Sequence, residues 1–221
     1  MCGDILDAWP GMNERVTVSS EELEQVRERQ RLDFVEIMSQ LEIPLVCVCG
    51  NHDVGNTPTP ATVKTYRRDF GDDFFSFWSG GVFFIVINSQ YHEDASLVTE
   101  AAGEQEAWLE QQLEIAESGK CKYSVVFQHI PYFVETPGEA KIQQNYSEPL
   151  RSTMLTRLCD AGVSKVFCGH YHRNAGGWFR AMEVVVTSAV GMQLGKDNNG
   201  FRLISVSERI IEHEYIELTK F

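Results

Sequence analysis

Four short segments combine residue types that bind metal ions, and each lies at the expected end of an apolar strand. They are Gly3-Asp4, Gly50-Asn51-His52-Asp53, Gln128-His129 and Gly169-His170-Tyr171-His172. Imidazole nitrogens and carboxylate oxygens suit zinc, iron or manganese, and the lack of a cysteine among the candidates argues against a closed structural zinc site. Because strand ends converge in sheets built from alternating strands and helices, the four segments predict one shared metal site.

The segments differ in what each shows alone. From average residue usage, a Gly-Asn-His-Asp sequence arises by chance about once per thousand proteins of this length, and Gly-His-x-His about once per hundred. A lone histidine such as His129 is more often a hydrogen-bonded structural residue, and Gly3-Asp4 alone is an ordinary turn. The inference therefore depends on the four segments together.

Phosphoester hydrolysis is the chemistry that such a site favours. Two cations roughly 3.5–4 Å apart lower the pKa of a bridging water and hold both the attacking and the leaving oxygens of an in-line displacement. His170 and His172 are two residues apart, which in extended backbone places them on one face. The spacing therefore predicts that the two imidazoles project to the same side of this segment.

The same segments, in the same order, resemble the motifs of the calcineurin-like metallophosphoesterases over nearly the whole chain. The resemblance implies an α/β (α+β) fold, with a central β-sandwich flanked by helices in αββα layers, and two divalent cations of the iron, zinc or manganese type. It implies that Asp4 bridges the two metals and that His172 binds the first. The remaining ligands of the second metal would be Asn51, His129 and His170.

The resemblance also implies the catalytic groups and the reaction. His52 would not bind metal but would face the phosphate, stabilise charge and protonate the leaving oxygen, held in place by Asp53. The reaction would be hydrolysis of a phosphomonoester by direct attack of a metal-bound hydroxide. The implied activity is that of a serine/threonine-protein phosphatase, with a phosphoprotein as substrate.

One departure from the family pattern leaves alternatives open. The family pattern opens with Asp-x-His on the first strand, and this sequence has no Asp-x-His upstream of Gly3. We therefore expect an N-terminally truncated domain that lacks its first strand and whose second metal site survives better than the first. A phosphodiesterase acting on nucleotides or other small molecules is one alternative, because the metal motifs do not set the substrate. A non-catalytic module that binds one metal or none is the other.

The bulk composition limits the class of protein. The chain has 221 residues, 43% of them hydrophobic, which suits a single domain over residues 1–221. Its formal net charge of −13 argues against nucleic acid or anionic membranes as partners, so a phosphate substrate needs local positive charge such as bound cations. With no signal-like start and no long apolar run, we expect a cytoplasmic protein, monomeric, with reduced cysteines.

Alternating helical and strand patterns predict the elements that position the segments. Helices are expected over 19–41, around 63–70, over 104–117 and over 147–161, and strands over 43–49, 82–87, 123–127 and 163–168, with consecutive strands over 182–187, 202–206 and 210–218. The run over 43–49 is almost continuously apolar, which is typical of a strand covered on both faces. The last three strands, with no helix between them, predict an antiparallel sheet at the end of the chain.

A few further residues near the motifs have open assignments. Arg173 follows the histidine pair and is a candidate for contacting a phosphate oxygen, although a salt bridge to an acid is the more common fate of an arginine. Trp9, Tyr132 and Phe133 are candidates for lining the cleft, with core or rim positions as the alternative. Asn88 and Ser89 follow a strand and either hydrogen-bond near the site or form a turn at the strand end.

Overall fold

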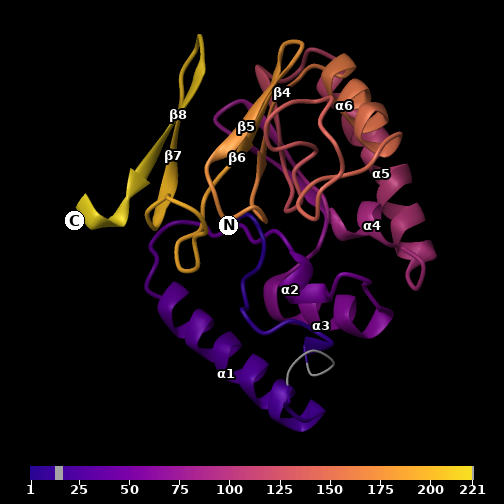
Figure 1. The fold of residues 1–221 in the computed structure, drawn as a ribbon. Helices are drawn as coiled ribbons and strands as arrows, with labels where there is room; N and C mark the ends of the chain where they lie inside the picture. The colour runs from indigo at the N-terminus through magenta and orange to yellow at the C-terminus, as the bar shows by residue number, and fades with distance from the viewer. Residues whose placement is uncertain (13–16, 221) are drawn as a thin grey trace.

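The computed structural model describes residues 1–12 and 17–220, and Figure 1 shows its elements. The helices are α1 (Ser20–Met38), α2 (Asn51–Val54), α3 (Pro60–Phe70), α4 (Gln90–Glu93), α5 (Thr99–Glu117), α6 (Leu150–Asp160) and the 3-10 helix η2 (Leu218–Lys220). The strands are β1 (Phe75–Ser79), β2 (Val82–Val86), β3 (Tyr123–Phe127), β4 (Val163–Cys168), β5 (Ala175–Phe179), β6 (Met182–Val186), β7 (Gly200–Val206) and β8 (Ile211–Glu217).

The main sheet has six strands in the order β1-β2-β3-β4-β6-β5. Its four central strands are parallel, whereas β1 and β5 are antiparallel edge strands. Phe127 at the end of β3 pairs with Phe167 near the end of β4, so the segments that follow these two strands leave the sheet side by side. The parallel register therefore brings two of the metal-binding motifs to the same edge.

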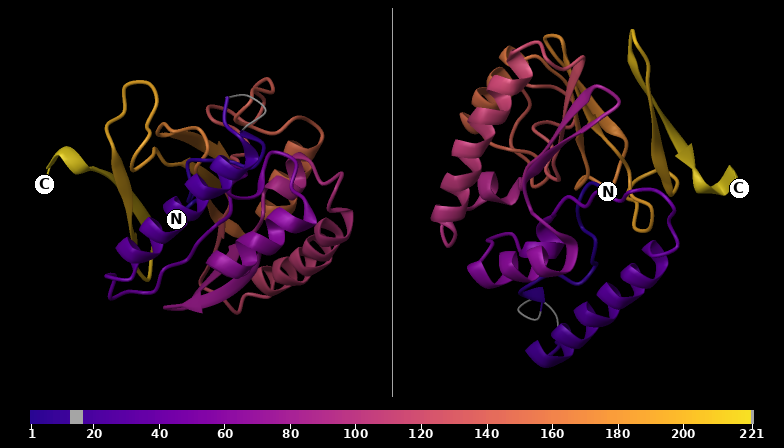
Figure 2. Two further views of the ribbon diagram at one scale, coloured as in Figure 1. Left: turned by 90° about the horizontal axis from the view of Figure 1, so that it is seen from below. Right: turned by 180° about the vertical axis from the view of Figure 1, so that it is seen from behind.

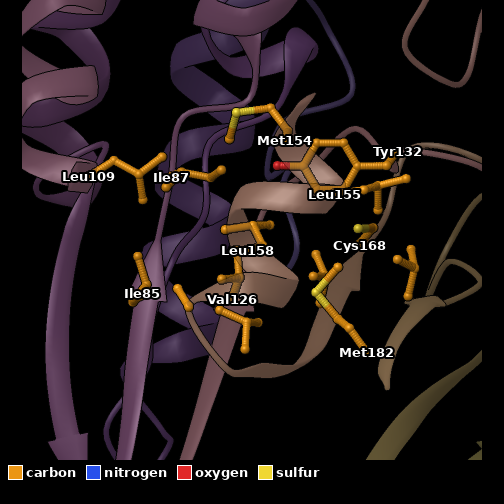
Figure 3. Packing of buried hydrophobic residues seen from close by; sticks show 14 of the residues in the cluster. Ile85, Ile87, Leu109, Val126, Tyr132, Met154, Leu155, Leu158, Cys168 and Met182 are labelled. Atoms are coloured by element: carbon orange, nitrogen blue, oxygen red, sulfur yellow. The ribbon is translucent and has the colours of Figure 1, made fainter. Parts of the chain in front are cut away.

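One face of this sheet is covered by α5 and α6, and the largest buried cluster lies between them. Ile85 and Val126 from the sheet pack with Leu109 of α5 and Leu158 of α6, all fully buried (Figure 3). Burial of side chains of this size contributes about 1.5–3 kcal/mol each relative to exposure. This face supplies most of the apolar stabilisation of the fold.

The opposite face is covered by the β7–β8 hairpin, which forms a separate two-stranded antiparallel sheet (Figures 1 and 2). Its Ile211 packs on Val125, Phe167 and Val185 of the main sheet in a smaller cluster. The mixed α/β class with a central sheet flanked by helices is thus confirmed. The expected closing antiparallel sheet consists of β7 and β8 alone, because β6 joins the main sheet beside β4.

A polar network also connects the hairpin to the main sheet. Arg202 on β7 donates from Nη1 to Nδ1 of His213 at 2.9 Å, and Nε2 of His213 lies 3.3 Å from Oε1 of Glu183 on β6. The other Arg202 nitrogen, Nη2, donates to Oδ1 of Asn174 at 2.6 Å. Asn174 belongs to the segment between β4 and β5, so the hairpin holds the segment that carries His170.

The strand expected over 43–49 is wrong. Within residues 1–12 and 17–220, the strand pairing of this region is limited to an isolated parallel bridge between Cys2 and Val48 with the adjoining backbone bonds of Met1. Ile43 and Leu45 are 70% and 40% exposed. Pro44 has no N–H for a ladder hydrogen bond, and no described strand lies beside residues 43–45. A continuous apolar run predicts burial only where neighbouring elements exist to cover it.

The start of the first helix agrees with the sequence prediction, but the burial of its apolar face does not. Ser19 caps α1 and forms the expected capping box with Glu22, but the helix ends at Met38, three residues before the expected end. Leu23 is buried, whereas Val26 and Ile37 are 48% and 59% exposed. The amphipathic pattern identified the apolar side of the helix but not whether anything covers it.

Two other elements differ from expectation near their ends. The helix expected from Ser147 begins at Leu150, because Pro149 disfavours helical backbone in the residue before it. Strand β5 was not expected, since its Ala-Gly-Gly start lacks a strand signature. Gly176 has a φ of +114°, and a Cβ there would meet the Val184 carbonyl oxygen at 2.1 Å.

Over the described residues, no helix combines the length and hydropathy needed to cross a membrane.

Candidate metal centre

The ends of β3 and β4, the first residues of α2 and the N-terminal segment meet at one point. Ligand atoms of Asp4, His129 and His170 all lie within 4.8 Å of one another. The backbone joins the two strand ends, since the N–H of Gly169 donates to the carbonyl of His129 at 3.0 Å. The expectation that His129 lies beside the Gly169 segment is confirmed.

His129 is the centre of this cluster, and its side chain is only 1% exposed. Its Nε2 lies 3.2 Å from Oδ2 of Asp4, 3.1 Å from Oδ1 of Asn51 and 3.1 Å from Nδ1 of His170. Four of the seven residues named from the sequence therefore come together around one atom. They are the four that the resemblance assigns to the second metal.

The hydrogen bonds of the two histidines show what fits between these atoms. Nδ1 of His129 bonds the carbonyl oxygen of Cys2 at 2.7 Å, and Nε2 of His170 faces the carbonyl oxygen of Gln143 at 3.4 Å. A carbonyl only accepts, so these nitrogens carry the hydrogens and the other ring nitrogens present lone pairs. Lone pairs of two imidazoles therefore converge with the oxygens of Asp4 and Asn51. This donor set fits a divalent transition metal.

The titration behaviour of the cluster agrees with that fit. Burial lowers the pKa of His129, but the charge and hydrogen bond of Asp4, with the Cys2 carbonyl and the charge of Asp53, together raise the pKa above its ordinary value. Burial likewise raises the pKa of Asp4, yet the attraction of His129 leaves it far below its usual range. Burial, followed by the charge on His129, lowers the pKa of His170 to about 3.

The backbone at the cluster adopts a conformation that L-residues rarely take. Asp4, His170 and His172 have φ values of 52°, 65° and 55°, in the left-handed region. Each such residue costs on the order of 1–3 kcal/mol and persists only where surrounding contacts hold it. A Cβ on Gly3 would meet Nδ1 of His129 at 2.3 Å, and one on Gly50 would meet Oδ1 of Asp4 at 2.2 Å. These two glycines allow the close approach of the segments.

Asp53 and His52 have contacts that differ from the expected ones. The buried Asp53 carboxylate accepts hydrogen bonds from the N–H groups of Ile5, Leu6 and Gly50 at 2.8–3.2 Å. Burial, with the charge of a neighbouring carboxylate, raises the pKa of Asp53 to about 7. Within the described residues it makes no hydrogen bond to the His52 ring, so its contacts position the N-terminal segment instead.

His52 lies beside the cluster with its ring against an aromatic neighbour. The main-chain N–H of His52 donates to Oδ1 of Asp4 at 2.9 Å, and the centroid of its ring lies 5.0 Å from that of Trp9. Trp9 is therefore a rim residue of the site, whereas Tyr132 and Phe133 are fully buried core residues. The assignment of His52 as the group that faces the phosphate stays a prediction.

His172 does not join the cluster. Its Nδ1 hydrogen-bonds the carbonyl oxygen of Met192, in the loop between β6 and β7. Alternate residues share a face only in extended backbone, and the left-handed φ at His170 and His172 turns this segment. The spacing argument fails here for that reason, and the role of His172 as a ligand of a first metal stays a prediction.

Two groups support His129, and the sequence pattern alone identifies neither of them as its partner. Oγ of Ser89, which is fully buried, accepts from the N–H groups of His129 and Ile130 at 3.2 and 3.1 Å. The sequence allows either a turn or a hydrogen bond near the site for Ser89, and the structure shows that Ser89 bonds the backbone of His129. The Cys2 carbonyl, which sets the tautomer of His129, is a main-chain group that no residue pattern identifies.

Comparisons with known proteins agree with this geometry. A match to the family described as "Calcineurin-like phosphoesterase" covers residues 1–174. The chain is 46% identical over 218 residues to the bovine (Bos taurus) "Serine/threonine-protein phosphatase CPPED1" and 44% identical over 219 residues to its human (Homo sapiens) counterpart. The alignments cover 99% of this chain but only 66% and 67% of those relatives, so the chain spans about two thirds of their length.

Solved structures show the same fold at low identity. A purple acid phosphatase, PPD1, from yellow lupin (Lupinus luteus) matches 85% of this chain and 41% of its own, with a TM-score of 0.61 and 14% identity. A dimetal phosphatase from Danio rerio matches 85% of this chain and 70% of its own, with a TM-score of 0.56 and 14% identity. From the family match and the close relatives together, the chain belongs to the calcineurin-like phosphoesterase family.

Proposed function

We propose that this domain is a metal-dependent phosphomonoesterase that acts on phosphoserine or phosphothreonine in proteins. The observation that supports the proposal is the convergence of Asp4, Asn51 and His170 on Nε2 of His129. The substrate class follows from the relatives named as serine/threonine-protein phosphatases. Because the chain spans about two thirds of those relatives, their substrate is carried over only as a proposal.

In this proposal the four cluster residues hold one divalent cation of the iron, zinc or manganese type. Asp4 and His172 are assigned to a second cation, which makes the site binuclear. Bound cations supply positive charge for the phosphate and acidify a water molecule so that it can act as a nucleophile at neutral pH. The positive charge of the cations also offsets, near the site, the repulsion that the formal net charge of −13 exerts on a phosphate.

The protein groups around the cations bind, orient and transfer protons. His52 is assigned to donate a proton to the leaving oxygen of the phosphoester, and its contact with the Trp9 ring orients the imidazole. Asp53 keeps the N-terminal segment in place through three backbone N–H groups, so that Asp4 faces His129. Asp53 is thus a positioning residue in this proposal.

Hydrolysis of para-nitrophenyl phosphate and of a phosphoserine peptide, with manganese, zinc or iron supplied in turn, tests the proposal. We expect turnover of both substrates with at least one metal and its loss after His129→Ala. His52→Asn should depress turnover and leave metal content unchanged. Metal content lost in His52→Asn but kept in His129→Ala would contradict the assignment of roles.

Two alternatives are separated by the same preparations. Preferential cleavage of cyclic nucleotides over phosphopeptides would identify a small-molecule phosphodiesterase. The position of His172 outside the cluster favours a module that binds a single metal without catalysis. A stoichiometry of one metal per chain, together with no turnover of para-nitrophenyl phosphate, would establish that module.

We also propose that the protein works as a monomer in the cytoplasm, with phosphoproteins as its partners. All six cysteine thiols are free in the structure, which suits a reducing compartment. Cell fractionation checks the location, and light scattering after size-exclusion chromatography checks the mass. Recovery of the protein in a secreted or membrane fraction would contradict the proposed location.

A further inference from the structure

The loop between β6 and β7 presents exposed apolar side chains next to the segment that carries His170 and His172. Val190, Met192 and Leu194 are 60%, 64% and 48% exposed. Single exposed apolar residues are ordinary, but a group of them at one place marks a contact surface. The loop is also braced, because the Asn199 side chain donates to the carbonyls of Val190 and Gly191 at 2.8 and 3.1 Å.

Hydrogen bonds attach this loop to the segment that carries the histidine pair. The N–H of Leu194 donates to the carbonyl of His172 at 2.8 Å, and the Ser188 hydroxyl donates to the same carbonyl at 3.1 Å. The Met192 carbonyl is bonded to the His172 ring. In Figure 1 the loop, drawn in orange, lies beside the N-terminus on the side of β7. The backbone of the loop is therefore held at a fixed position beside the segment that carries His170 and His172.

Two cations stand on the same loop surface. The Arg173 side chain lies against Gly195, where an added Cβ would meet Arg173 Nε at 2.9 Å, and its guanidinium lies 5.2 Å from the ring centre of Tyr171. Lys196 is the next residue along the loop and is exposed. Neither cation has a carboxylate partner among residues 1–12 and 17–220, although the chain carries 32 acids. Their charge is free to attract an anionic ligand.

We propose that Val190, Met192, Leu194, Arg173 and Lys196, here termed the docking rim, bind the peptide on either side of a phosphorylated residue. The inference rests on the proposed phosphatase function and narrows its substrates. The favoured substrate is an extended segment with apolar side chains next to the phosphoresidue and an acidic residue beyond them. Continuity with the metal centre and complementary charge select this ligand, because a nucleotide or an aryl phosphate has no side chains to cover the apolar part.

Binding of short peptides by fluorescence anisotropy tests the docking rim without relying on turnover. The probes are fluorescein-labelled eight-residue peptides that contain the non-hydrolysable phosphonate analogue of phosphoserine. One peptide has leucine on both sides of the phosphonate followed by aspartate, and the other has glycine and serine at those positions. With the manganese-loaded protein we expect the leucine peptide to bind at least about tenfold more tightly, as burial of two apolar side chains would give.

Matched variants localise the effect. The double variant Met192→Ser, Leu194→Ser should reduce the preference for the leucine peptide to about twofold or less, and Lys196→Gln should weaken binding of the aspartate-containing peptide. Leu97→Ser is the control, because Leu97 is 58% exposed and lies in a different loop, before α5. All these positions are exposed, and circular dichroism verifies that the variants fold.

The outcomes distinguish the docking rim from the proposed function. Equal affinity for the two peptides, or an equal loss in Leu97→Ser, overturns the docking rim even if para-nitrophenyl phosphate is hydrolysed. Failure to hydrolyse any phosphoester with any metal, while the leucine preference and its loss in the double variant remain, overturns the phosphatase function and keeps the rim as a peptide-binding surface.

Discussion

The metal cluster and the docking rim both take residues from the chain between β4 and β7, where His170 and the rim lie, yet they are held in opposite ways. In the cluster, His129 is 1% exposed and the metal-ligand atoms of Asp4, His129 and His170 lie within 4.8 Å of one another. In the rim, Val190 and Met192 are 60% and 64% exposed, and hydrogen bonds fix only the backbone of their loop. The buried groups of the cluster, held in left-handed backbone, are fixed in position and suit one metal ion. The side chains of the rim are exposed on a loop held by its backbone, so they can be replaced without disturbing the fold. Changes in the cluster should therefore alter metal binding, and changes in the rim should alter substrate choice.

The strongest test of this contrast is His129→Ala. Loss of the central imidazole should weaken zinc or manganese binding by at least about 100-fold, because even indirect supports of metal ligands are worth 10–100-fold. Isothermal titration calorimetry measures the affinity. The control is His92→Ala, since Nε2 of His92 bonds Glu106 on the helix-covered side of the sheet. Unchanged affinity in His129→Ala would refute the cluster as a metal site.

The next test compares the two histidines of one segment. His170→Ala should weaken metal binding by about 10–100-fold, because Nδ1 of His170 faces the cluster. His172→Ala should change the affinity of the same site by less than about threefold, since its ring bonds the Met192 carbonyl instead. Titration of both variants against wild type decides the matter, and equal losses would mean that the cluster extends to His172.

A smaller effect is expected where the hairpin supports the segment between cluster and rim. Arg202→Met removes donors to Asn174 and His213 and should lower the free energy of unfolding by about 1–3 kcal/mol. Metal affinity should be kept, while the peptide preference of the rim should fall. Urea denaturation measures the stability, with Arg180→Met as the control, because the ion pair of Arg180 with Asp160 is exposed and its other contact is with the Phe179 ring, away from the hairpin. Loss of metal with no change in stability would contradict this separation.

The smallest effect should come from a charge remote from both regions. The hydrogen bond from His92, with added contributions from Arg157, lowers the pKa of Glu106 to about 2 from an ordinary 4.5. A depressed carboxyl pKa adds stability that is present above about pH 4.5 and is lost as the pH falls through 2. Glu106→Gln should cost less than about 1 kcal/mol at pH 7, because solvent screens this half-exposed group.

Thermal or urea unfolding from pH 7 to pH 2 follows that difference. The gap between wild type and Glu106→Gln should narrow as the pH falls below about 4.5. Metal affinity and peptide preference should be the same in both proteins at pH 7. A gap that stays constant with pH would assign the loss to packing and not to charge.

Local signals in the sequence predicted those parts of the fold that depend on neighbours in the chain. The capping box of Ser19 and Glu22 forms as expected, because it needs only four consecutive residues. Strands β3 and β4 lie where their buried apolar runs indicated, and the parallel register then brings His129 to the Gly169 segment. The cluster could be predicted because its residues follow strands whose ends must meet.

Features that depend on partners far away in sequence could not be read in the same way. The apolar run that includes Ile43 is exposed, since burial depends on what lies beside it. The departure of His172 from the cluster depends on left-handed backbone that spacing does not reveal. The contacts of Asp53 with Ile5 and Leu6 join segments more than 45 residues apart and involve main-chain groups, which have no residue signature.

The bond between His129 and the Cys2 carbonyl has a consequence for stability. A cation in the cluster would bind to Asp4 near the beginning of the chain and to His129 and His170 in its second half. It would therefore act as a removable cross-link between these segments. Such a link favours the native state by an amount that grows with the logarithm of free metal concentration. Chelation should then lower the melting temperature, and the first few residues should become the first part of the protein open to proteases.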